Sequence, residues 1–353
     1  MLGLLGLLGA VFAGFMVDAF SSNKSDEDDV SASEDAPPDE AGGHEAEASL
    51  LDDLSGPDAV AMSAPGRDGG SEAGMPVSDD LADPQDQDVT LAGGAANDIL
   101  TGDGGNDRIT GDAGNDLLGG RAGDDQIDGG DGVDWVHGGD GADTLAGAAG
   151  QDDLHGEAGS DRLEGGAGGD LLSGDGGRDH LTAGEGNDGL IGGEGADMLR
   201  GGLGDDGLQG GLGQDRAQGG DGSDTVDGND GNDLLWGDRA GADDGAVDFL
   251  NGGAGDDALH LGAGDYGNGG TGADRFVLDD IVAGAPLARI TDFDGAEDAL
   301  VLLYDASLHI APEVSIVTEA GSADAVVMLD GVPVAHVQGG AGLTAADVRL
   351  QAA

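Results

Sequence analysis

The sequence has no cysteine, 3% aromatic residues and only 12 lysines and arginines among its 353 residues. The absence of cysteine excludes disulfide bonds and thiolate metal sites. The shortage of aromatic side chains argues against the large apolar core of an ordinary globular domain. The 12 basic residues are set against 73 aspartates and glutamates, which gives a net charge of −61. Such a polyanion repels nucleic acid, so we expect no nucleic-acid partner.

What the sequence does contain is glycine, 75 residues of it, arranged at a fixed period. Residues 93–236 divide into sixteen consecutive blocks of nine without insertion or deletion, beginning with Gly93–Thr101 (GGAANDILT). Position one is Gly except at Ala183, and position four is Gly except at Ala96. Position eight is Leu, Ile or Val except at Ala217. Position six is always aspartate: Asp98, Asp107, Asp116, Asp125, Asp134, Asp143, Asp152, Asp161, Asp170, Asp179, Asp188, Asp197, Asp206, Asp215, Asp224 and Asp233.

Each block predicts a tight loop followed by a short strand. Gly at positions one and four permits a positive φ, which lets the first six residues turn sharply and point backbone carbonyls into a small space. The carboxylate at position six completes an all-oxygen site, which suits a hard cation such as Ca²⁺ rather than zinc or copper. Positions seven to nine form the strand. Because side chains alternate along a strand, the aliphatic residue at position eight points inward, while positions seven and nine point outward.

This pattern, G-G-x-G-x-D-x-U-x with U a large aliphatic residue, resembles the RTX (repeat-in-toxin, or haemolysin-type) calcium-binding nonapeptide. The resemblance implies an all-β fold, a parallel β-roll (β-helix solenoid), here over residues 91–278. In that family two nonapeptides make one coil, and repeats n and n+2 share calcium. The position-six aspartates and loop carbonyls are then the Ca²⁺ ligands. The less regular repeats after residue 236 add Asp257 and Asp274 to the expected ligands.

Two irregular blocks interrupt the pattern after residue 236. Residues 237–251 resemble one repeat with six inserted residues and end in Asp248-Phe-Leu-Asn. Residues 261–268 are one residue short and carry Tyr266 where the aspartate belongs, which counts against a site in that block.

The C-terminal residues 279–353 have no period of nine and are predicted to form a β cap on the solenoid, since a solenoid needs its end covered. Strands are expected at 301–304, 314–318, 325–329 and 332–337. Asp330-Gly331 predicts a hairpin turn between the last two strands, and Pro333 suggests an edge strand. The tail Leu343-Thr-Ala-Ala-Asp-Val-Arg-Leu resembles that of type I secreted RTX proteins, which implies a secretion signal and a type I secretion apparatus as partner.

The N-terminal region has two parts of different character. Residues 1–20 open with seventeen uncharged residues, which predicts either a membrane anchor or a cleaved signal peptide without a basic region. Any membrane contact is expected through this segment alone. Residues 21–90 are rich in Asp, Glu, Ser, Ala, Gly and Pro, which predicts a disordered acidic linker.

The leading hypothesis is a secreted or surface calcium-binding protein that folds on binding extracellular Ca²⁺ and has no catalysis of its own. Each repeat buries only one aliphatic side chain, and stacked aspartates repel one another, so the metal-free array is expected to be unfolded. Neither H-E-x-x-H nor G-x-S-x-G occurs. Two alternatives stay open: a structural or adhesive surface-layer protein, and the accessory calcium-binding portion of a secreted hydrolase. The repeat histidines are expected at outward or edge positions: His137, His155, His180 and His260.

Overall fold

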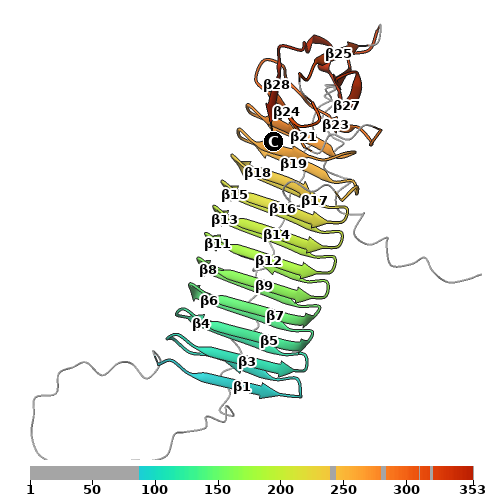
Figure 1. Cartoon of the computed structure of the whole chain (residues 1–353). Helices are drawn as coiled ribbons and strands as arrows, with labels where there is room; N and C mark the ends of the chain where they lie inside the picture. Colours follow the sequence, from blue (N-terminus) through green and yellow to red (C-terminus); the bar gives the residue numbers. More distant parts are fainter. Residues whose placement is uncertain (1–86, 239–243, 280–283, 310, 319–320, 353) are drawn as a thin grey trace, which may run out of the picture. The chain divides into compact units, whose positions relative to one another are not determined.

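A computed structural model describes residues 87–352 except 239–243, 280–283, 310 and 319–320. The N-terminal hydrophobic segment and nearly all of the predicted acidic linker lie outside the described residues. The described part is an all-β parallel solenoid in which strands from two sheets alternate along the chain (Figure 1). The helical content of this part is one 3₁₀ turn at Gly340–Gly342. Among the described residues, no helix has the length and apolar character that crossing a membrane requires.

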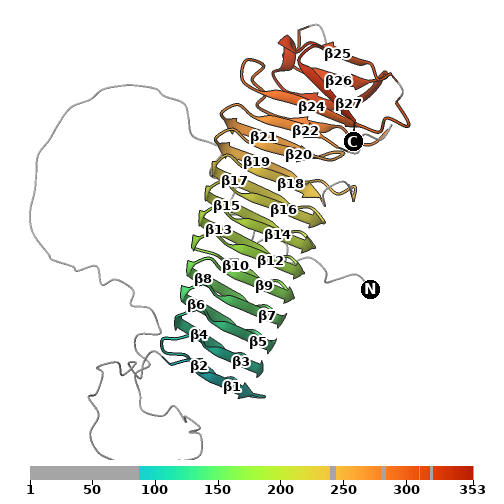
Figure 2. The ribbon, with the colours of Figure 1, turned by 60° about the vertical axis from the view of Figure 1, so that its left-hand side comes forward.

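Successive coils stack so that their strands pair side by side in each of the two sheets, as Figure 2 shows from a second direction. Sheet A contains, in spatial order, β1 (Thr90–Gly94), β3 (Arg108–Ala113), β5 (Gln126–Gly132), β7 (Thr144–Gly150), β9 (Arg162–Ala167), β12 (His180–Glu185), β14 (Met198–Leu203), β16 (Arg216–Asp221), β18 (Leu234–Asp238), β20 (Ala258–Leu261), β22 (Arg275–Leu278), β24 (Ala299–Tyr304) and β28 (Val348–Ala352). Sheet B contains β2 (Ile99–Thr101), β4 (Leu117–Ala122), β6 (Trp135–Gly141), β8 (Asp153–Gly159), β10 (Leu171–Ser173) with β11 (Gly176–Gly177), β13 (Gly189–Gly195), β15 (Gly207–Gly213), β17 (Thr225–Gly231), β19 (Phe249–Ala254), β21 (Tyr266–Thr271), β23 (Ala288–Ile290), β27 (Val332–Val337), β26 (Ala325–Leu329) and β25 (Val314–Thr318).

The register of the solenoid is eighteen residues per coil. Strand β7 pairs in parallel with β9 so that Leu145 lies beside Leu163, and the same offset places Leu163 beside Leu181 in β12. These position-eight side chains are 0–1% exposed and form a continuous column between the sheets. The prediction that position eight points inward is confirmed, because the flanking positions seven and nine of the sixteen repeats are partly or fully exposed, with the buried Gly119 as the exception. Each strand of the regular repeats therefore contributes one aliphatic side chain to the core.

The glycine requirement differs from the one predicted. Positive φ occurs at positions two and four, whereas none of the position-one glycines adopts it. At position four, Gly204 has a φ of +124°, and a Cβ there would lie 1.7 Å from the carbonyl oxygen of Gly186 in the coil before. At position one, a Cβ on Gly210 would lie 2.6 Å from the Asp215 carboxylate. Position one is therefore glycine because of close approach, not because of its backbone conformation.

The C-terminal strands continue the two sheets of the solenoid. β24 and β28 add to sheet A in parallel, and β23 and β27 add to sheet B in parallel. A meander of β27, β26 and β25 then ends sheet B with antiparallel pairs. The hairpin prediction is confirmed, since Asp330 and Gly331 both have positive φ between β26 and β27.

The edge-strand prediction from Pro333 is wrong for its strand as a whole. β27 lies between β23 and β26, so it is an internal strand of sheet B. Proline is tolerated there because β23 pairs only with Ala335, His336 and Val337. Pro333 precedes that stretch, where its missing N–H breaks no bond to β23.

Candidate metal centre: two files of buried aspartates

The position-six aspartates form two files, one along each long edge where the chain passes from one sheet to the other. In each file, an aspartate Oδ1 accepts the backbone N–H of the aspartate one coil earlier. For example, the Asp143 N–H donates to Asp161 Oδ1 at 2.8 Å, and the Asp161 N–H donates to Asp179 Oδ1 at 2.8 Å. The backbone N–H of each loop thus fixes the carboxylate of the loop one coil later in the same file.

The file that precedes the strands of sheet A contains Asp107, Asp125, Asp143, Asp161, Asp179, Asp197, Asp215, Asp233, Asp257, Asp274 and Asp298. The file that precedes the strands of sheet B contains Asp98, Asp116, Asp134, Asp152, Asp170, Asp188, Asp206, Asp224, Asp248 and Asp265. The structure therefore brings every predicted site residue into a file. From Asp107 to Asp274 these side chains are buried, while Asp98 and Asp298, at file ends, are half-buried.

Three members of the files do not appear among the predicted ligands. Asp248 ends the block with the six-residue insertion and follows Asp224 by 24 residues in its file. Asp265 corrects the expectation drawn from Tyr266: the carboxylate is one residue earlier because the loop is one residue shorter, and it is 1% exposed. Asp298 extends the other file beyond the last repeat, ahead of β24. A search that allowed loops of variable length would find the first two.

The second carboxylate oxygen of these aspartates has a different environment from the first. Within the described part of the chain, Oδ2 is buried and accepts no hydrogen bond in every file member from Asp107 to Asp233, and in Asp248 and Asp257. A buried carboxylate oxygen without a partner is strongly unfavourable unless a cation compensates it. The orphaned oxygens therefore indicate a positively charged ligand along both files.

The oxygens around the orphaned atom fit calcium. The position that a Cβ on Gly210 would occupy lies 2.6 Å from Asp215 Oδ2 and 2.8 Å from the carbonyl oxygen of Gly228 in the next coil. The same convergence recurs beside Gly165, with Asp170 Oδ2 and the Ala183 carbonyl. A hard cation with flexible coordination takes such sets of carboxylate and carbonyl oxygens. Loops one coil apart contribute together, as the resemblance of repeats n and n+2 implies.

Burial makes the metal-free carboxylates hard to ionise. Burial raises the pKa of Asp143 to about 7; the Asp125 N–H opposes this shift, and the carboxylates of Asp161 and Asp125 add to it. Burial likewise raises the pKa of Asp206 to about 7, with further contributions from Asp188 and Asp224. These shifts have the same two causes, desolvation and like charges one coil apart. A divalent cation would oppose both.

The sequence matches the family described as RTX calcium-binding nonapeptide repeat (4 copies) at residues 90–118, 119–154, 137–172, 155–190, 173–208, 182–217, 209–240 and 244–267. The chain is an RTX repeat protein. RTX nonapeptides bind Ca²⁺ at multiple sites, and the parallel solenoid is the β-roll of this family. A search of curated proteins finds no match.

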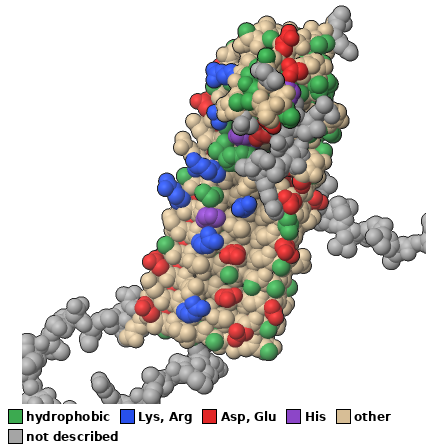
Figure 3. All heavy atoms as spheres, in the orientation of Figure 1, with side chains coloured by type: hydrophobic (Ala, Val, Ile, Leu, Met, Phe, Trp, Pro, Cys, Tyr) green, Lys and Arg blue, Asp and Glu red, His purple; other side chains and the backbone are tan. Residues whose placement is uncertain are grey.

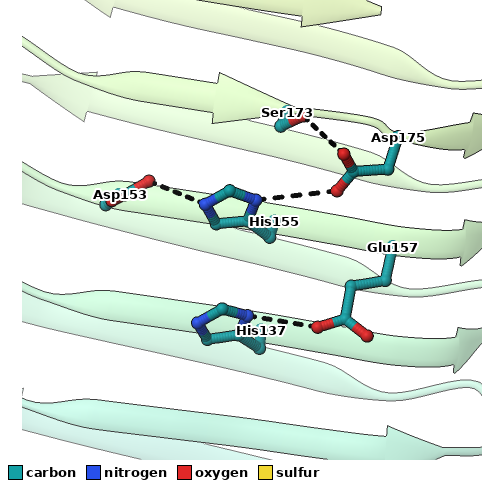
Figure 4. Close-up of polar contacts among 6 residues, drawn as sticks. All are labelled: His137, Asp153, His155, Glu157, Ser173 and Asp175. Atoms are coloured by element: carbon teal, nitrogen blue, oxygen red, sulfur yellow. Dashed lines mark hydrogen bonds and ion pairs between the residues drawn. The ribbon is translucent and has the colours of Figure 1, made fainter. Parts of the chain in front are cut away.

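The outer faces of the RTX roll carry the remaining polar groups. Acidic and basic side chains both stand out from a largely uncharged surface on the face shown in Figure 3. On sheet B, the rings of His137 and His155 stack 5.1 Å apart, and carboxylates of Glu157, Asp153 and Asp175 contact them (Figure 4). Parallel stacked rings direct their lone pairs in parallel, so this cluster does not converge on one metal ion.

Proposed function

We propose that this RTX repeat protein is a non-catalytic calcium-binding protein that is exported and folds when it meets extracellular Ca²⁺. The observation that supports the proposal is the buried Oδ2 atoms of both files, which from Asp107 to Asp233 have no hydrogen-bond partner among the described residues. The aspartates of the two files, including Asp248, Asp265 and Asp298, would hold the ions together with loop carbonyls. Ca²⁺ supplies the positive charge that lets these carboxylates stay ionised inside the fold.

Calcium would also supply much of the folding free energy. The core offers one aliphatic side chain per strand, and the negative charges of each file stand one strand spacing apart. Ligand that binds only the folded chain stabilises it at every site, and the contributions of many stacked sites accumulate. The repeats are then unfolded without metal, and with calcium they form the solenoid.

The experiment that tests the proposal is circular dichroism of the full chain during a Ca²⁺ titration, with hydrodynamic radius measured in parallel. We expect a disordered spectrum and a large radius without calcium, and a β spectrum with a smaller radius at millimolar Ca²⁺. Mg²⁺ is the matched control ion, because it demands a tight octahedral shell and substitutes poorly. A β spectrum that persists after calcium removal at neutral pH would refute calcium-dependent folding.

The same energetics support export of the unfolded chain. Sites tuned like those of extracellular modules, with dissociation constants of about 10⁻⁴–10⁻³ M, stay empty at cytosolic Ca²⁺ levels. We propose that a type I secretion apparatus recognises the C-terminal tail, with export through residues 1–20 as the rival route. Deleting residues 338–353 should retain the protein in the cell under the first route, whereas deleting residues 1–20 should do so under the second. Normal yield of the C-terminal deletion outside the cell would rule out the first.

A second candidate function, a structural or adhesive surface protein, is favoured by apolar side chains on the outer face of sheet B. Ile99 is 61% exposed, and Trp135, Leu171, Ile191 and Phe249 are also exposed. Exposed apolar patches often mark contact surfaces. Light scattering of the calcium-loaded protein tests this function: calcium-dependent assembly that Trp135→Ser and Leu171→Ser abolish would support it, and a strict monomer would count against it.

A further inference from the structure

The irregular coil between β18 and β21 gathers three carboxylates where the regular coils do not. Asp238, Asp248 and Asp265 each place one carboxylate oxygen within 4.8 Å of the others. Asp248 and Asp265 are 1% exposed, and Asp238 is half-buried. No other group of three metal-ligating side chains converges in this way among the described residues. Three negative charges at this spacing are unstable together without a cation.

The two oxygens of Asp248 differ in their surroundings. Asp248 Oδ1 accepts the Asp224 N–H at 2.8 Å, as in any regular coil. Asp248 Oδ2 is buried and accepts no hydrogen bond from the part of the chain that the structure describes. It faces the open side of Gly237, where a Cβ would lie only 2.1 Å away. The glycine thus leaves room beside the orphaned oxygen.

The third carboxylate comes from a position that is turned outward in regular repeats. At position two, Asp112 and Asp175 have φ values of 73° and 64°, and both side chains are exposed. Asp238 occupies the same position but is not among the residues with a left-handed φ, and its side chain is half-buried. The Asp244 N–H, which follows the inserted residues in sequence, donates to Asp238 Oδ1 at 3.1 Å and so fixes the Asp238 carboxylate.

The electrostatics of Asp248 agree with this geometry. Burial raises its pKa to about 8; the Asp224 N–H lowers it, and the carboxylates of Asp265, Asp238 and Asp224 raise it further. A bound cation would remove this repulsion at neutral pH.

We propose that Asp238, Asp248 and Asp265 form a three-carboxylate Ca²⁺ site, separate in composition from the repeat sites, that fills at a lower Ca²⁺ concentration than they do. The proposal rests on the proposed function. The number of charged ligands is a main determinant of calcium affinity, and the regular coils supply no third carboxylate. The site lies at the end of the repeats nearest the C-terminal strands, so its occupation would order this end of the solenoid first.

The test is a Ca²⁺-binding titration of the full chain, by calorimetry and flow dialysis, in three forms: unchanged, Asp238→Asn and Asp112→Asn. Asp112→Asn is the matched control, because it removes an exposed carboxylate from position two of a regular repeat. We expect Asp238→Asn to weaken the tightest binding step by about tenfold or more, with the later steps and the β spectrum at high Ca²⁺ retained. Asp112→Asn should leave all steps unchanged.

A second measurement locates the step. In a Trp135→Phe background, the first equivalent of Tb³⁺ should show emission sensitised by Trp236, which lies two residues before Asp238. Asp238→Asn should abolish this early emission, and Asp238→Glu, which keeps the charge, should retain it. An unchanged tightest step in Asp238→Asn overturns the three-carboxylate site while leaving the proposed function intact. Absence of Ca²⁺ binding by the unchanged chain would overturn both.

Discussion

At the residue scale, each aspartate of the files divides its two oxygens between two tasks. Oδ1 of Asp161 holds a backbone N–H of the coil before, and Oδ2 remains for the ion. Glycine makes this division possible by letting adjacent coils approach within reach of the carboxylate. At position four the demand is strictest, because both the sign of φ and the neighbouring carbonyl exclude a side chain.

Gly204→Ala should therefore be strongly destabilising. The substitution places a Cβ at a φ of +124° and 1.7 Å from the Gly186 carbonyl oxygen, so the coil must open. We expect a loss of about 2 kcal/mol or more in unfolding free energy at saturating Ca²⁺, measured by urea titration. Gly119→Ala is the control, since a Cβ at this strand position meets only Thr101 Cγ2, at 3.9 Å. Equal urea midpoints for the two variants would contradict this account of the glycines.

At the element scale, a coil is stable only against its neighbours, and its aspartate links three coils. Asp161→Ala removes the acceptor of the Asp143 N–H as well as a carboxylate, so sites on both sides should weaken. The unsatisfied N–H alone costs about 1–3 kcal/mol. In the described residues, no backbone N–H donates to the half-buried side chain of Asp98, so Asp98→Ala should cost less. Ca²⁺ midpoints from circular dichroism compare the two variants, and equal midpoints would count against cooperative stacking.

The nine-residue period predicted most of this architecture because each nonapeptide forms one loop and one strand. In every nine residues, one side chain points into the core and one aspartate reaches the loop one coil away. Counting residues alone therefore identified the files from Asp98 to Asp233. Counting failed where loop length changed. Asp248 and Asp265 belong to the file because each accepts the backbone N–H of the file aspartate one coil earlier, although the number of residues between them differs from eighteen. The half-buried position of Asp238 goes with a hydrogen bond from the Asp244 N–H across the inserted residues, which the nine-residue period does not encode.

At the scale of the whole molecule, 19 of the 73 acidic residues are aspartates buried inside the fold, in two rows of carboxylates that burial and mutual repulsion affect alike. Burial, with added repulsion from neighbouring carboxylates, raises the pKa of Asp143, Asp179 and Asp233 to about 7. The unfolded chain releases these protons near the ordinary aspartate value of about 4. Between these values the folded metal-free chain binds more protons than the unfolded chain, so its stability falls as pH rises from about 4 to about 7.

Acidification is therefore expected to favour the metal-free fold but to weaken calcium binding. In buffer depleted of Ca²⁺ by a chelating resin, lowering the pH from 7.5 to 5.5 should increase the β signal, because protonation neutralises the files. In the same range the Ca²⁺ midpoint should rise, because protons compete with the ion for Oδ2. Circular dichroism at several pH values measures both effects, with light scattering to exclude precipitation near the isoelectric point of about 4.1. A β signal without calcium that weakens on acidification would mean that the file aspartates are already ionised in the metal-free fold.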